Sequence, residues 1–258
     1  MAPQLNPKRP AERNLPVRPP FGDPLRGNPV FSALDAEARR RLSAQGKVRL
    51  YASGERILQE GDAADWFYVL LAGSVRVYHL DDDGLEVLAK LFGPPAVFGE
   101  MELLAGLRHL EHVSALEPAT LLLLPRAAFL EALESCHGFA LALLRDVCHR
   151  FCISGANEKA LAFYDVPKRL ATFLVSYAHF YGLAREGDAA RLPVTQDEMA
   201  GALGVTRRAV AKTMRLWRAQ GLVAREGDLY VVSDLGRLER EASSELSLTY
   251  RSDMAFTE

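Results

Sequence analysis

The fold of the C-terminal part is decided by residues 194–223, which read "VTQDEMAGALGVTRRAVAKTMRLWRAQGLV". Thr195 and Glu198 have the T-x-x-E spacing of a capping box, which predicts that a helix begins here. Gly204 can adopt the left-handed conformation that ends such a helix. Thr206 can cap a second helix directly after it. Two short helices joined at a glycine predict a helix-turn-helix unit.

The second helix of this unit is predicted to separate apolar from basic residues. At about 100° per residue, Val210, Met214 and Trp217 fall on one arc and are predicted to be buried. The opposite arc carries Arg207, Arg208, Ala211, Lys212, Arg215 and Arg218. An ordinary solvated helix would mix charge signs on this face. No acidic residue occurs between positions 203 and 225, and charge of one sign favours contact with a polyanion.

A hairpin is predicted directly after these helices. "LVAREGDLYVV" at 222–232 alternates on both sides of "EGD", which is typical of a short hairpin or wing. An arginine can donate two hydrogen bonds to guanine or to phosphate, whereas a lysine acts as a point charge. A helix-turn-helix followed by a wing therefore predicts DNA binding rather than an unspecialised solvated helix.

Residues 49–125 have a different character. Short apolar runs are punctuated by glycines, "DDDG" at 81–84 indicates a turn, and "ATLLLLP" at 119–125 indicates a buried strand. Several strands at this spacing predict a barrel or sandwich. The region at 183–192, "LAREGDAARL", is predicted to be a polar connection.

A long helix is predicted over about 138–160. Its apolar positions step by three and four along Leu141, Leu144, Cys148, Phe151 and Gly155. Such an a/d stripe is typical of a seam between two helices, so we favour a homodimer interface. Packing of the stripe on the chain's own barrel is the alternative.

Composition limits the remaining possibilities. The 258 residues carry a formal net charge of -2, and no apolar run approaches the ~18 residues of a spanning helix. The N-terminus has no apolar signal region, so we expect a cytoplasmic protein without a membrane partner. Residues 1–29 contain eight of the fourteen prolines and are expected to form a flexible arm. No function is predicted for the charged tail at 237–258.

Catalytic and metal-binding patterns are weak. Three cysteines cannot supply a four-thiolate cluster from one chain, and no nucleophile or phosphate-loop motif is present, so we predict that the protein is not an enzyme. His109 and His112 would point to opposite faces of a strand, which leaves a cupin-like metalloenzyme as a distant alternative. Cys148 and Cys152 lie four apart on one helix face, which leaves a redox-responsive regulator as a nearer one.

Residues from about 30 to 232 resemble the cyclic-AMP receptor (Crp/Fnr) family of bacterial transcription regulators. The resemblance is carried by "FYVLLAGSVRVY" at 67–78, "FGEMELL" at 98–104, "LAFYDVPKRLATFL" at 161–174 and the stretch at 194–223. It implies an α+β fold: a cyclic-nucleotide-binding β-roll (jelly roll) at 30–135, a dimerisation helix at 136–163 and a winged helix-turn-helix at 164–236. The arm at 1–29 and the tail at 237–258 fall outside it.

The resemblance also implies roles in DNA binding. Base contacts fall on Arg207, Arg208 and Lys212, and phosphate contacts on Thr195, Gln196, Thr206 and Arg215. Arg208 stands where the best-known members have a glutamate that accepts from cytosine. We therefore expect a homodimer on a palindromic operator, with RNA polymerase as a partner, that reads a different half-site.

An effector pocket in the roll is implied as well, with allosteric control of DNA binding. Its residues would be Gly99, Glu100, Met101, Arg108, His109 and Ser154. The family's phosphate-clamping arginine and its hydroxyl neighbour align with His109 and Leu110, and Arg108 lies one place early. Cyclic AMP is therefore one candidate effector, with Arg108 as the compensating guanidinium, and another effector or none is the alternative.

Overall fold

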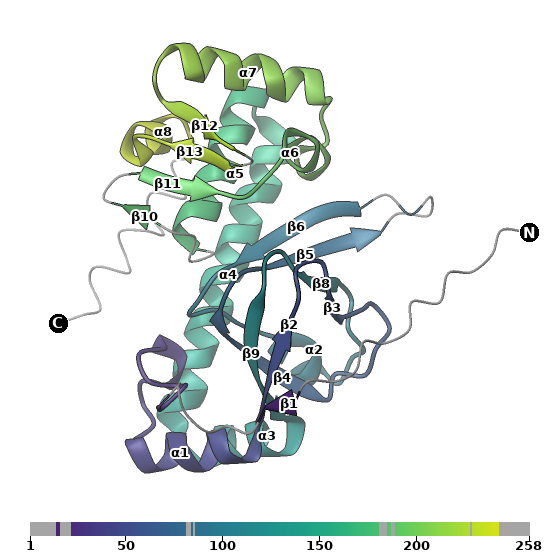
Figure 1. Cartoon of the computed structure of the whole chain (residues 1–258), viewed down its shortest axis with the longest axis vertical. Helices are drawn as coiled ribbons and strands as arrows, with labels where there is room; N and C mark the ends of the chain where they lie inside the picture. Colours follow the sequence, from purple (N-terminus) through teal and green to yellow (C-terminus); the bar gives the residue numbers. More distant parts are fainter. Residues whose placement is uncertain are drawn as a thin grey trace, which may run out of the picture.

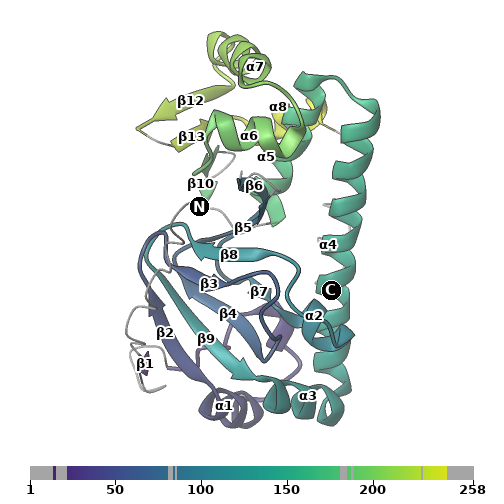
Figure 2. The same ribbon diagram turned by 90° about the vertical axis from the view of Figure 1, so that its right-hand side faces the viewer.

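The computed structural model describes residues 14–15, 22–80, 84, 86–180, 185–186, 189–227 and 229–242. An N-terminal β-roll and a C-terminal helical unit are stacked along one long helix, α4 (His137–Phe163), as Figures 1 and 2 show. Among the described residues, no single helix is long and apolar enough to cross a membrane. Only the pair of α3 (Arg126–Ser135) and α4, bent by 112°, passes that test together.

The roll consists of two antiparallel sheets. One has the strand order β1-β2-β9-β4-β7 and the other β3-β8-β5-β6. Their bounds are β1 Asn14–Leu15, β2 Lys47–Tyr51, β3 Arg56–Leu58, β4 Trp66–Ala72, β5 Val75–Leu80, β6 Glu86–Phe92, β7 Val97–Phe98, β8 His112–Ala115 and β9 Ala119–Pro125. The predicted strand at 119–125 is confirmed, and its central position between β2 and β4 explains its continuous apolar run.

Short helices flank the roll: η1 Pro29–Phe31, α1 Ala36–Gln45, α2 Glu100–Ala105 and α3 Arg126–Ser135. An aromatic cluster joins these layers to α4. The Phe31 ring stacks on Phe139 with centroids 5.2 Å apart, and Phe67 stacks on Phe129 at 4.3 Å. Because Phe139 belongs to α4, the beginning of that helix is part of the roll's own core.

Part of the proline-rich segment also joins this core, which corrects the expectation of a flexible arm through residue 29. Leu25 is fully buried, and Asp23 forms an ion pair with Arg39 at 2.7 Å. The Asn28 amide donates to the Pro95 carbonyl at 2.7 Å. A single apolar side chain among prolines has no periodicity that would predict its burial. The arm's residues 1–13 and 16–21 lie outside the described residues.

Helix α4 buries one face and exposes another. Its buried residues are Phe139, Leu143, Ile153, Ala156 and Ala160. The predicted stripe of Leu141, Leu144, Cys148, Phe151 and Gly155 is exposed, with Phe151 77% and Leu144 57% accessible. The chain's own roll therefore packs on a different face of α4 from the stripe.

The C-terminal unit packs helices against a small sheet of order β10-β11-β13-β12. Its elements are α5 Val166–Phe180, β10 Arg185–Glu186, β11 Ala189–Leu192, α6 Gln196–Leu203, α7 Arg207–Ala219, β12 Val223–Glu226, β13 Leu229–Val232 and α8 Leu235–Glu241. The predicted polar connection at 183–192 contains the strand β11, which was not predicted, and its Ala190 and Leu192 are buried and pair with β13. The tail is likewise ordered as far as Ala242, since α8 buries Leu238.

Candidate functional site

The start of α6 has the geometry that its sequence predicts. The Thr195 amide donates to Glu198 Oε2 at 2.7 Å, and the Glu198 amide donates to Thr195 Oγ1 at 3.1 Å. Gly204 ends the helix with φ 60°, and Thr206 caps α7 by accepting from the Ala209 amide at 3.3 Å. Each turn of the helix-turn-helix is therefore fixed by a local hydrogen bond or a left-handed glycine.

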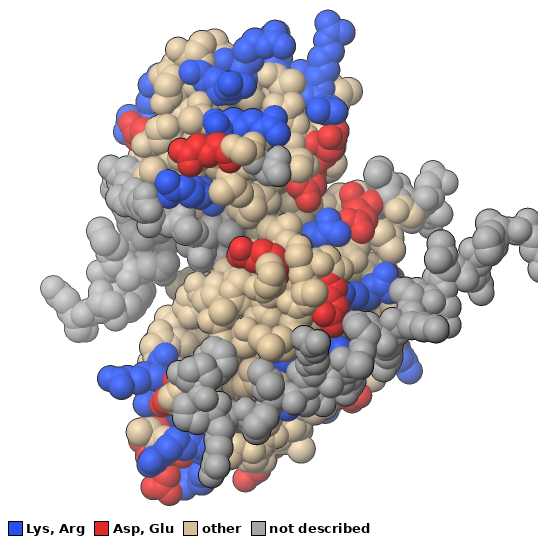
Figure 3. Space-filling view, in the orientation of Figure 1, with Lys and Arg blue, Asp and Glu red and all other residues tan. Residues whose placement is uncertain are grey.

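Helix α7 presents a continuous basic face. Val210, Met214 and Trp217 are buried, as predicted, and anchor the helix on the domain. On the opposite side, Arg208, Lys212 and Arg215 are exposed, and Arg207 and Arg218 are exposed at the border between this side and the buried one. Figure 3 shows Lys and Arg gathered at the end of the molecule where Figure 1 places α7.

The basic side chains of α7 divide into two groups. Arg208, Lys212 and Arg215 border a shallow hollow together with Thr206, Ala209 and Ala211. Arg207 instead has its Nη1 3.5 Å from Asp197 Oδ2 of α6, and both side chains are 68% exposed. An exposed pair of this kind is weak, so Arg207 is free to exchange Asp197 for another acceptor.

The wing follows as a two-stranded hairpin. β12 pairs with β13 from Val223 opposite Val232 to Glu226 opposite Leu229. Arg225 reaches back from β12 and donates to the Gly227 carbonyl at 3.0 Å, with its guanidinium 5.8 Å from the Tyr230 ring. The predicted hairpin is confirmed, and it extends the helix-turn-helix at its C-terminal side.

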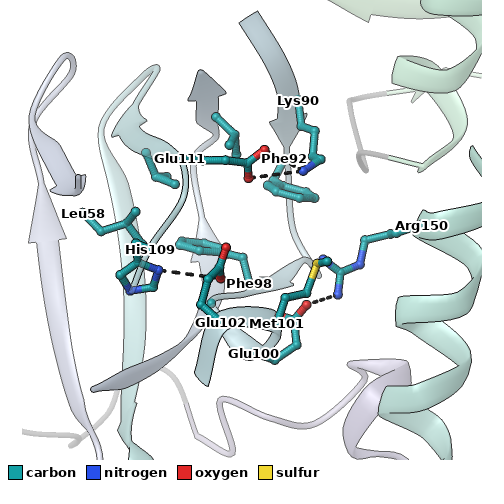
Figure 4. A pocket seen from close by; sticks show the side chains of 13 residues that line it. Leu58, Lys90, Phe92, Phe98, Glu100, Met101, Glu102, His109, Glu111 and Arg150 are labelled. Carbon is teal, nitrogen blue, oxygen red and sulfur yellow. Dashed lines mark hydrogen bonds and ion pairs between the residues drawn. The ribbon is translucent and has the colours of Figure 1, made fainter. Parts of the chain in front are cut away.

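A second candidate site is a cavity between the roll and α4, drawn in Figure 4. Its volume is about 40 Å³. Its lining comes from β3, β5, β6, β7, α2, the loop between α2 and β8, β8 and α4. It consists of Leu58, Val77, Lys90, Phe92, Phe98, Gly99, Glu100, Met101, Glu102, His109, Glu111, Val113 and Arg150.

Gly99 and Glu100, at the beginning of α2, both line this cavity. Gly99 has φ 84°, and a Cβ there would lie 2.8 Å from the Tyr68 ring, so only glycine fits. Glu100 is fully buried, and burial raises the pKa of its carboxyl group. Arg150 of α4 donates to Glu100 Oε1 and also to Asp146 Oδ2, the latter at 2.9 Å. Glu100 Oε2 is buried without a hydrogen-bond partner.

Two further contacts between a basic and an acidic side chain lie in the cavity lining, and Figure 4 shows both. Lys90 Nζ donates to both oxygens of Glu111, at 3.0 and 3.2 Å. His109 Nδ1 lies 3.7 Å from Glu102 Oε2. Burial opposes ionisation of Glu102, but hydrogen bonding from His109 and its own backbone lowers the pKa of that carboxyl overall.

The structure brings together only part of the predicted effector set. Gly99, Glu100, Met101 and His109 line the cavity. Arg108 does not, because its Nη1 donates to the Gly61 carbonyl at 2.8 Å and its side chain is exposed. The prediction that the Arg108 guanidinium replaces the family's phosphate-binding arginine is therefore wrong for this conformation, in which Arg108 does not reach the cavity. Ser154 is exposed on α4 and is also absent from the lining.

Sequence reasoning missed Arg150, Glu102, Lys90 and Glu111 as cavity residues. Arg150 lies four residues before Ser154 on the same helix, and that spacing is the one available signal. The described residues contain no group of three or more His, Cys, Asp or Glu able to hold a metal ion. His112 instead has Nε2 3.8 Å from Glu60 Oε2. In the described part of the chain, the metalloenzyme alternative therefore has no ligand set.

Comparison with known proteins matches both halves of the chain. Residues 48–136 match the cyclic nucleotide-binding domain family, and residues 168–241 match the Crp-like helix-turn-helix domain family. The solved structure of a CRP-family transcriptional regulator from Thermus thermophilus is 30% identical. The match covers 74% of this chain and 95% of that one, with a TM-score of 0.59.

The chain belongs to the Crp/Fnr family of transcription regulators. Another relative is the CRP-like cAMP-activated global transcriptional regulator of Mycobacterium tuberculosis. It is 27% identical over 215 residues, which cover 83% of this chain and 96% of the relative. Bradyrhizobium japonicum FixK2 shares the fold at 22% identity, with a TM-score of 0.67 over 77% of this chain and 98% of that one. This Crp/Fnr chain is thus a DNA-binding transcription regulator with a β-roll of the cyclic nucleotide-binding domain family and a helix-turn-helix domain.

Proposed function

We propose that this Crp/Fnr regulator acts as a homodimer that reads a palindromic operator through α7. Arg207, Arg208 and Lys212 contact base edges in the major groove. Thr195, Gln196, Thr206 and Arg215 contact phosphates. The two α7 helices of a dimer then enter half-sites about one helical turn, ~34 Å, apart. RNA polymerase is the partner through which bound DNA is transcribed or blocked.

The observation that carries this proposal is the one-sided charge of α7. Its apolar side is buried at Val210, Met214 and Trp217, so the helix cannot rotate its basic side away from solvent. Arginine and lysine side chains on a protruding helix are suited to guanine O6 and N7 and to phosphate oxygens. The reading face carries no acidic residue on α7 to mask this charge.

The second copy in the proposed dimer sits on the exposed stripe of α4. Leu144 and Phe151 are large apolar side chains that are more than half accessible in a single chain. A row of such residues at heptad positions is suited to pairing with the same row of a second α4 about a two-fold axis. The dimer then places two α7 helices symmetrically, as a palindrome requires.

We assign the roll at 30–135 to effector sensing, 136–163 to dimerisation and 164–236 to DNA binding, and the contacts between them supply the coupling. Nη1 of Arg76 in β5 lies 3.9 Å from Glu198 Oε1. The other carboxylate oxygen of Glu198, Oε2, accepts from the Thr195 amide in the α6 capping box. The Tyr177 hydroxyl of α5 donates to the Ala89 carbonyl of β6 at 3.3 Å. A change in the position of β5 and β6 is thereby passed to the first helix of the DNA-binding unit.

The test is selection of bound sequences from a random duplex library by the full chain, with and without cyclic AMP. A two-fold symmetric site with half-sites about 10 base pairs apart is expected. Arg207→Ala should relax one base position in each half-site and weaken specific binding by roughly 1–3 kcal/mol. Recovery of no symmetric sequence, or unchanged base preference in Arg207→Ala, would refute the proposal.

A further inference from the structure

Every basic group in the roll cavity already faces a carboxylate. Arg150 lies between Glu100 and Asp146, and Lys90 donates to both oxygens of Glu111. The imidazole of the third group, His109, faces Glu102 at 3.7 Å. Figure 4 shows the three pairs around the cavity. No lining cation among the described residues is left over for an incoming anion.

The charge of the lining is also unfavourable for an anion. Lys90 and Arg150 contribute two positive charges, and Glu100, Glu102 and Glu111 contribute three negative ones, so the formal charge of these five side chains is -1. An anionic phosphodiester loses its hydration on entry and requires donors in return. Here it would have to break an existing ion pair, and the released carboxylate would then repel it.

The guanidinium of Arg108 does not relieve this deficit. Arg108 is the adjacent basic residue in the chain, but it is exposed and bonded to the Gly61 carbonyl. Leu110, on the other side of His109, is 57% exposed and has no polar side-chain atom. Of residues 108–110, only His109 lines the cavity, and its imidazole faces the Glu102 carboxylate.

The cavity does contain one unused acceptor. Glu100 Oε2 is completely buried and has no donor, and a buried acceptor without a partner is costly. Phe92 and Phe98 add flat apolar walls, with ring centroids 6.1 Å apart and planes within 4°. A ligand with a flat apolar body and a hydroxyl or amine group would satisfy both features.

We infer that the cavity excludes anionic cyclic nucleotides and takes an uncharged or cationic ligand that donates a hydrogen bond to Glu100. The inference rests on the proposed role of the cavity as the effector site. The volume of about 40 Å³ holds about three water molecules, far below the ~300 Å³ of a typical ligand site. A ligand must therefore displace the flexible Met101 and move α2 relative to α4, which links its binding to the long helix.

The test compares adenosine with cyclic AMP by titration calorimetry on the full chain. The two compounds share the base and the ribose ring, and only cyclic AMP carries a charged phosphate. The wild-type protein is expected to bind adenosine at least ten-fold more tightly. His109→Arg combined with Leu110→Ser supplies a guanidinium and a hydroxyl, and it should reverse the order by at least ten-fold.

The control is Arg108→Ala, which changes a guanidinium outside the lining and should alter neither affinity. Glu102→Gln provides a milder variant should the double variant fail to fold, because it removes one negative charge and releases His109. It should raise the affinity for cyclic AMP relative to that for adenosine. Circular dichroism and operator binding check the fold of each variant.

The possible results distinguish failure of this inference from failure of the proposed function. Tighter binding of cyclic AMP than of adenosine by the wild type overturns the inference, and so does the absence of heat with either compound. Folded variants that still exclude cyclic AMP overturn the role given to His109 and Glu102. Operator binding is measured on the same preparations. If adenosine binds as expected but the chain binds no DNA, the proposed function fails and the ligand preference stands.

Discussion

Replacement of Arg208 by glutamate should change which base the protein selects while leaving its fold intact. Arg208 is exposed in the first turn of α7, and it forms no ion pair with any described residue. A surface substitution of this kind usually changes the free energy of unfolding by less than ~0.5 kcal/mol. An acidic residue in the first turn is also favourable with the helix dipole. Changes in DNA binding can therefore be attributed to the interface.

The expected loss of DNA affinity in Arg208→Glu has two causes: a lost base contact and a reversed charge. Removal of a bidentate arginine–guanine contact costs about 1–3 kcal/mol, or roughly 5- to 150-fold in affinity for the selected operator. Loss of one positive charge near the backbone reduces the dependence of log K on log salt by about 1, and the added negative charge weakens binding to all duplexes. A carboxylate accepts from cytosine N4, so the variant should prefer cytosine where the wild type prefers guanine.

The assay is fluorescence anisotropy with the selected operator and with the guanine-to-cytosine substituted duplex, at several salt concentrations. Arg218→Glu is the matched control, because it reverses the same charge near the end of α7. That control should weaken binding to both duplexes equally. If Arg208→Glu keeps the wild-type preference, or if both variants lose affinity without any change in preference, Arg208 does not read a base and the reasoning is refuted.

Four further outcomes are expected. Phe151→Ser should raise the dimer dissociation constant at least ten-fold in sedimentation experiments without lowering the stability of the single chain, because that side chain is 77% exposed; unchanged association would refute the seam. Thr195→Ala should cost about 1 kcal/mol in urea unfolding through loss of the α6 cap, and a neutral effect would contradict that capping role. Arg76→Ala removes a hydrogen bond to Ser114 at 3.0 Å and an ion pair with Glu86 at 2.9 Å as well as the contact with Glu198, so it should cost about 1–3 kcal/mol in stability. It should also increase hydrogen exchange at the start of α6, where Arg76 faces Glu198; exchange there that rises no more than in the rest of the DNA-binding unit would argue against coupling through this pair. The lowered pKa of Glu102 contributes stability that is present above its unfolded pKa of about 4.3 and is lost as pH falls through the lower folded value. The free energy of unfolding of Glu102→Gln should therefore depend less on pH in this acid range than that of the wild type. Identical pH dependence in the two proteins would contradict this role of Glu102.

The helix-turn-helix could be predicted almost residue by residue, because its determinants are local. The capping box of Thr195, the left-handed Gly204 and the buried arc of α7 each depend on residues within a few positions of one another. The continuous apolar run at 119–125 also predicts a strand, and periodicity predicts the stripe of α4. Burial of the opposite face and exposure of the stripe follow from the same 3.6-residue repeat.

The cavity could not be predicted in this way, because its contacts join distant segments. Arg150 and Glu100 are 50 positions apart, and Lys90 and Glu111 are 21 apart. Alignment to a family pattern suggests Arg108 as a substitute ligand. Its actual direction depends on the Gly61 carbonyl, which no local pattern connects to it. Leu25 and β11 escaped prediction for the same reason, since tertiary packing orders segments that are too short to show a period.

Helix α4 connects these features mechanically. Arg150 places its guanidinium between Asp146 of its own helix and Glu100 of the cavity lining. Phe151, the next residue, points to the exposed stripe, and two turns later Asn157 accepts from the Ser176 hydroxyl of α5 at 3.3 Å. A continuous helix transmits rotation along its length more readily than it bends without a proline or bulge. A ligand that donates to Glu100 Oε2 and moves α2 relative to α4 would therefore displace the exposed stripe and α5 together. In the proposed dimer, the orientation of the two α7 helices would then depend on whether one buried carboxylate oxygen has a donor.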